Sequence, residues 1–133
     1  MTPESTLAPS ELAWISDADS ISYMEPETDN VWITLVCSRG TGNIHIEDPL
    51  REQPTNTITL VSGTITEGYA ATMGRADKEL GFPPGAVADA PSTSPLMRHF
   101  RQTGELKFQG GQEMPIRRED ERQQIDAFFS RCG

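Results

Sequence analysis

The segment from Val31 to Cys37, with the sequence VWITLVC, narrows the folds open to this chain more than any other segment. Side chains of a β-strand alternate between two faces, and here the odd-numbered and the even-numbered positions are both mainly apolar. Such a strand is stable where other elements cover it on both sides. The segment therefore predicts a central strand of a β-sandwich or a small closed barrel.

Three pairs of strand-like segments, each joined by a turn that contains glycine, predict three hairpins. The pairs are 31–37 with 43–47, 57–61 with 64–66, and 105–109 with 113–117. The second hairpin turns at Ser62-Gly63, continues from Tyr69 to Met73 and is expected to have a bulge at Gly68. Residues 74–91 are rich in glycine and proline, so they are predicted to form a long loop.

Two helices are predicted in the last third of the chain. Ser94-Pro95 offers a hydroxyl cap and a proline at the first helical position, and Gly104 is a stop signal. The final segment REDERQQIDAFFSRCG opens with acidic residues and ends in glycine. Its apolar positions 125, 128, 129 and 132 follow the helical period, so one stripe of this helix should be buried.

The predicted fold class is mainly β with α. We expect a small antiparallel β-sandwich or barrel of about six to eight strands, with one short helix and a C-terminal helix packed on the sheet. The length of 133 residues fits one domain. Residues 1–10 have two prolines and little to bury, which predicts a flexible leader, and 11–133 should form a single β-rich domain.

The chain is acidic, with 20 Asp and Glu against 11 Lys and Arg and a formal net charge of −9. This charge argues against nucleic acid as a partner and favours a basic protein, although it also serves solubility alone. No stretch reaches the ~20 apolar residues of a membrane helix, and the start lacks the features of a signal peptide. Membrane contact is therefore expected only through an anchor that has been removed.

The two cysteines, Cys37 and Cys132, each fall on the predicted core-facing side of their element. They could therefore meet in a disulfide, which would favour an oxidising compartment. The alternative is two reduced, buried cysteines in a cytoplasmic protein. With only two histidines in the chain, they form no recognisable zinc site.

The sequence predicts neither a catalytic residue nor a cofactor or metal site. His45 and His99 share no spacing that pairs a base with a nucleophile, and both are expected at the surface. The acidic stretch at positions 17–29 lacks the spacing of a calcium loop, so we expect it to be a solvent-exposed acidic edge. The candidate binding surface comprises Ser62, Gly63, Tyr69 and Phe82.

The order of ISYMEPETDNVWITLVC, ITLVSG, SPLMRHFRQTGELKF and IDAFFSRCG resembles small envelope proteins of proteobacteria, often lipoproteins. The resemblance covers nearly the whole chain but includes no catalytic motif. It implies a periplasmic or membrane-tethered β-domain in which Cys37 is bridged to Cys132. The lipidated cysteine and export signal of such proteins are absent here, which leaves the cytoplasm as the alternative location.

A weaker resemblance is to the membrane-bound lysozyme inhibitors, whose loop motif has Ser-Gly followed by Tyr, as at Ser62, Gly63 and Tyr69. The Trp-x-Lys-Gly part of that motif is absent. The leading functional hypothesis is a non-enzymatic envelope domain with a binding or structural role. The alternatives are an inhibitor of a basic hydrolase such as lysozyme and, less favoured, a small hydrolytic enzyme.

Overall fold

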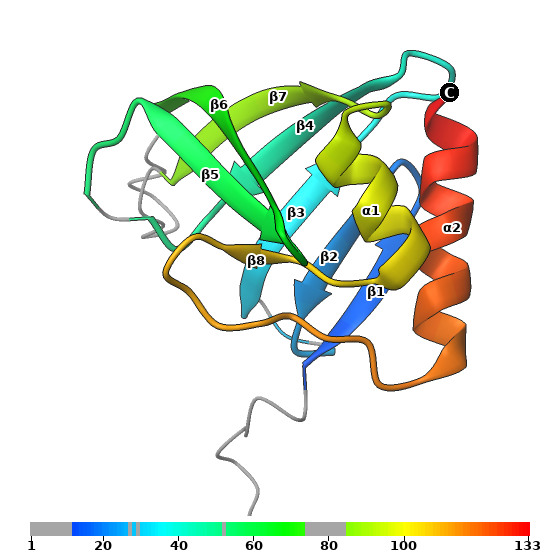
Figure 1. The fold of residues 1–133 in the computed structure, drawn as a ribbon. Coiled ribbons are helices and arrows are strands. Elements are labelled where there is room, and N and C mark those ends of the chain that lie inside the picture. Colours follow the sequence, from blue (N-terminus) through cyan, green and yellow to red (C-terminus); the bar gives the residue numbers. More distant parts are fainter. Residues whose placement is uncertain (1–11, 27, 29, 52, 74–84) are drawn as a thin grey trace, which may run out of the picture.

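The computed structural model describes residues 12–26, 28, 30–51, 53–73 and 85–133 (Figure 1). The predicted leader, residues 1–10, lies outside these ranges. Eight strands and two helices are present in the described part of the chain, so the predicted class, mainly β with α, is confirmed. The strands are β1 (Ala13–Asp17), β2 (Ser20–Met24), β3 (Val31–Val36), β4 (Asn43–Asp48), β5 (Thr57–Ser62), β6 (Ile65–Met73), β7 (Ala86–Pro91) and β8 (Lys107–Phe108).

The strands form one antiparallel sheet in the order β1-β2-β3-β4-β7-β6-β5-β8. The sheet curls into a half-barrel (Figure 1), so β1 and β8 stay at its edges. The helices α1 (Pro95–Thr103) and α2 (Glu119–Cys132) cover the concave face in place of further strands. Ile33 and Leu35 of β3 are fully buried on that face, whereas Trp32, Thr34 and Val36 are only partly buried. The central strand is therefore fully covered on one side only.

Two of the three predicted hairpins are confirmed. β3 pairs with β4, and β5 pairs with β6 around Ser62-Gly63. The bulge expected at Gly68 is absent, because Gly68 pairs with Thr59 in an unbroken register. The third hairpin is wrong: only Lys107–Phe108 forms a strand there, and it pairs with β5. The segment 112–117 has no strand, although the Met114 amide donates to the Leu106 carbonyl at 3.0 Å.

The long loop predicted for 74–91 is wrong in its last part, because Ala86–Pro91 forms β7. The sequence AVADAP has little β propensity of its own, so local pattern favours a loop. β7 is a strand because β4 and β6 pair with it on both sides, and its inward alanines leave room for the larger core side chains. Residues 74–84 lie outside the described ranges.

Both helices begin and end near the predicted residues. Ser94 caps α1 by accepting a hydrogen bond from the Met97 amide at 3.2 Å, and Gly104 follows as the C-cap. The helices bring aromatic side chains onto the concave face, where the Trp14 ring lies 5.0 Å from the ring of Phe100. Figure 1 shows α1 in the hollow of the sheet and α2 beside β1.

Candidate functional site

An open depression of 410 Å³ is lined by the end of β4, the turn that follows it and β8. It is lined by Asp48, Leu50, Arg51, Gln53 and Phe108. Among the described residues, Leu50 is the one large apolar side chain that is mostly exposed, at 56% of its surface. Apolar surface beside a depression is a recurrent feature of binding sites, so we take this depression as the candidate site in the described part of the chain.

Charged groups lie beside this apolar patch. Asp48 is the last residue of β4 and is buried, and its Oδ2 atom is 3.5 Å from Nε of Arg51. Burial raises the pKa of the Asp48 carboxyl above its ordinary value of 3.8, although the positive charge of Arg51 acts in the opposite direction. A titratable group perturbed by burial in a depression is more frequent at functional sites than elsewhere.

We predict that Asp48→Asn changes the pH dependence of stability. Below pH 3.8 the carboxyl is protonated in both the folded and the unfolded state, so it carries no charge to bury. As the pH rises through this value, the unfolded chain loses its proton first, which favours unfolding. The free energy of unfolding of the wild type, minus that of the variant, should therefore fall between pH 3.8 and the raised pKa. Urea unfolding across this pH range measures the difference, and an increase with pH would show that Arg51 outweighs burial.

The described residues of the predicted binding surface, Ser62, Gly63 and Tyr69, do not form one exposed site. Ser62 is fully buried: its hydroxyl donates to the Glu105 carbonyl at 2.6 Å and lies 2.7 Å from Nδ1 of His99. Because that proton goes to a backbone carbonyl, His99 can only donate to Ser62 and is not arranged as its base. This cluster therefore fastens the β5–β6 turn to α1.

Gly63 is packed closely against the His99 ring. Its φ is +61°, and a Cβ atom added there would be 2.6 Å from Cε1 of His99. Gly63→Ala should therefore lower the free energy of unfolding by about 2 kcal/mol, from backbone strain and from a displaced His99. Gly40→Ala is the matched control, because Gly40 has φ +79° and no atom within 4 Å of the added Cβ. The control should lose only about 1 kcal/mol in chemical denaturation, and equal losses would contradict the proposed contact.

Tyr69 of the predicted surface is also turned inward. Its hydroxyl donates to Oε1 of Glu67 at 2.7 Å, and burial together with this carboxylate raises the pKa of the Tyr69 hydroxyl. The other carboxylate oxygen of Glu67 accepts the Leu96 amide at 3.2 Å in the first turn of α1. Tyr69 and Glu67 thus hold the start of the helix, and Phe82 lies outside the described residues.

His45 lies on the outward face of β4, as predicted. Its Nδ1 is 3.3 Å from Oδ1 of Asp89 on the neighbouring strand β7, and its Nε2 is 3.8 Å from Oε2 of Glu47. All three side chains are solvent-accessible, so the ion pairs they could form contribute little to stability. Across the described ranges, no group of three or more His, Cys, Asp or Glu is placed to hold a metal ion.

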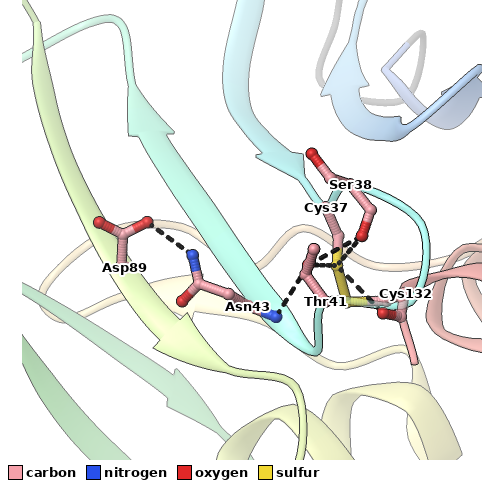
Figure 2. The surroundings of a disulfide bond; sticks show 6 residues. All are labelled: Cys37, Ser38, Thr41, Asn43, Asp89 and Cys132. Atoms are coloured by element: carbon pink, nitrogen blue, oxygen red, sulfur yellow. Dashed lines mark hydrogen bonds between the residues drawn. A yellow bond between two sulfur atoms is a disulfide. The ribbon is translucent and has the colours of Figure 1, made fainter.

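Cys37 and Cys132 form a disulfide with a Cα–Cα distance of 5.3 Å (Figure 2). Both cysteines are buried, and the bond joins the end of β3 to the end of α2 across 95 residues. Beside it, the Thr41 hydroxyl donates to the Ser38 carbonyl at 2.8 Å (Figure 2). The bond confirms the cysteine pairing and is compatible with a location outside the cytoplasm.

Comparisons of the chain with protein-family models, with curated proteins and with solved structures found no match. The protein is therefore classified by its fold alone: it is a disulfide-linked β half-barrel with two helices on the concave face. Neither helix in the described part of the chain is long and apolar enough to span a membrane.

Proposed function

We propose that this protein is a small binding domain of the cell envelope, which holds a partner rather than transforming a substrate. The observation that carries the proposal is the depression between β4 and β8, where Leu50 is exposed beside the Asp48–Arg51 pair. An apolar anchor surrounded by polar groups is the usual arrangement of a protein-binding site. The envelope location is supported by the buried disulfide, since such bonds persist in oxidising compartments.

The histidines support a binding role over hydrolysis. The Ser62 hydroxyl, which lies 2.7 Å from Nδ1 of His99, already gives its proton to the Glu105 carbonyl. The contacts of the His45 ring are with two carboxylates, those of Glu47 and Asp89. A hydrolase needs a base within reach of the proton that it removes from a nucleophile or a water.

The partner that best fits is a basic protein with a protruding apolar side chain. That side chain would enter the depression against Leu50 and Phe108, and the net charge of −9 would attract the basic surface around it. Inhibition of a basic hydrolase such as lysozyme stays the alternative within this class. A point against this alternative is that Ser62 is buried, so it offers no exposed hydroxyl to the enzyme.

Site-specific photo-crosslinking in a bacterial envelope tests the proposal. The full chain carries a photoreactive phenylalanine at Leu50, and the control carries it at Thr66, which is exposed on β6. We expect an envelope protein attached at position 50 and not at position 66, together with an intact disulfide in the recovered chain. Equal attachment at both positions, or two free thiols, would overturn the proposal.

Leu50→Asp should lower the affinity for the crosslinked partner by about tenfold or more, because it removes an apolar anchor. The melting temperature should stay close to that of the wild type, since Leu50 is 56% exposed. Titration of the purified partner measures the affinity, with Thr66→Asp as the control for added charge. For a lysozyme partner, binding should also weaken steeply with salt.

A further inference from the structure

The outer edge of β1 is covered by side chains of the C-terminal segment. In the described part of the chain β1 pairs only with β2, so residues 12, 14 and 16 direct their backbone groups away from the sheet. The Trp14 amide donates to Oε1 of Glu121 at 3.0 Å, and the Ser16 amide donates to Oε1 of Gln124 at 2.8 Å. The Leu12 carbonyl accepts from Nη1 of Arg117 at 2.9 Å. These side chains occupy the place of a ninth strand.

Helix α2 is held at both of its ends. At its start, Oε2 of Glu121 accepts the amides of Arg117 and Arg118 at 3.2 and 3.1 Å. At its end, the Gly42 amide donates to the Cys132 carbonyl at 2.8 Å, and the disulfide joins Cys132 to Cys37. With this bond in place, α2 cannot leave β1 without pulling on the end of β3 in the middle of the sheet.

We propose that the Cys37–Cys132 disulfide is a redox lock on this strand edge, and that its reduction lets β1 pair with β1 of a second copy of this chain. A dithiol reductant transfers two electrons and two protons to the two sulfur atoms. The S–S bond breaks, two thiols form, and the reductant becomes a disulfide. Helix α2 is then a terminal element that can open locally while the rest of the sheet stays folded.

The strand itself argues for a second copy as the partner. Residues 12–16, LAWIS, contain no charge and no proline, which are the usual devices that prevent edge-to-edge pairing, and the one charged residue of β1 is Asp17 at its end. An uncovered, uncharged edge pairs with an identical edge across a two-fold axis, because each supplies the amides and carbonyls that the other lacks.

The experiment compares the oxidised wild type with the full-length variant Cys37→Ala, Cys132→Ala, which needs no reductant. Amide hydrogen exchange is followed at Trp14 and Ser16 and, as the internal control, at Leu35 in the middle of the sheet. In the variant, diluted until it is monomeric, we expect the two β1 amides to exchange at least about tenfold faster than Leu35. Light scattering should show reversible dimers, and adding Ser16→Pro, which removes the edge amide, should abolish them.

A variant that stays monomeric, or in which all three amides exchange at one rate, overturns the proposal. If the variant does not fold, the oxidised wild type provides the test. Its α2 is locked, so the amides of Trp14 and Ser16 should exchange no faster than that of Leu35. Faster exchange at β1 in the oxidised protein would show that the disulfide does not hold the edge closed.

Discussion

Replacing both cysteines by alanine is expected to lower the free energy of unfolding by about 2–5 kcal/mol. The bond closes a loop across 95 residues, so removing it returns much conformational freedom to the unfolded chain. Small domains are stable by about 5–15 kcal/mol in total, so this loss is a large fraction of the whole. Urea unfolding followed by the fluorescence of Trp14, which is fully buried, measures it.

Wild-type protein unfolded in the presence of a reductant is the control for this prediction. It should lie close to the double variant, because neither chain has the bond that closes the loop across 95 residues. Thr41→Ala, which removes a hydroxyl 3.5 Å from Sγ of Cys37 but leaves the bond intact, should change stability far less. A double variant within about 1 kcal/mol of the oxidised wild type would show that the bond adds little to the fold.

Glu121→Ala is expected to lower the free energy of unfolding by roughly 2–4 kcal/mol, because it leaves the buried Trp14 amide and two partly buried amides without an acceptor. The Glu121 side chain is only 1% exposed and accepts three amides, those of Trp14, Arg117 and Arg118. No other side chain of the described residues is seen to accept these amides. The same urea titration measures the loss of stability.

Glu119→Ala is the matched control for this variant, since Glu119 is an exposed acid in the same turn of α2. It should change stability by less than about 0.5 kcal/mol. Glu121→Gln keeps one acceptor oxygen and should lie between the two. Equal stabilities for the Glu119 and Glu121 variants would contradict a structural role for the buried carboxylate.

Local sequence pattern predicted the elements whose side chains follow a clear period. The strand at 31–36, the hairpin around Ser62-Gly63 and both helices are formed where predicted. Local pattern failed for segments whose structure depends on the strands that lie beside them. β7 is a strand because it lies between β4 and β6, whereas 112–117 is not a strand although its Met114 amide donates to the Leu106 carbonyl beside the edge strand β8. Neither outcome can be read from one segment of the chain.

The candidate site was not predicted. Leu50 looks like an ordinary turn residue in the sequence DPLR, and its exposure matters only because Phe108 lies across the same depression. In contrast, Ser62 and Tyr69 resemble a loop motif in the sequence but are turned inward by His99 and Glu67. A run of glycine and hydroxyl residues marks a turn without showing which way its side chains point.

The sequence alone predicted the class of the fold and the ends of the helices, which depend on local period, and it favoured a bond between its two cysteines while leaving the reduced pair as the alternative. Only the tertiary structure decided that Glu121 and Gln124 cover the edge of β1 and that Leu50 stays exposed. Both outcomes depend on contacts between distant segments. Such contacts leave no periodic signal, because each is made by one or two residues once the sheet has curled.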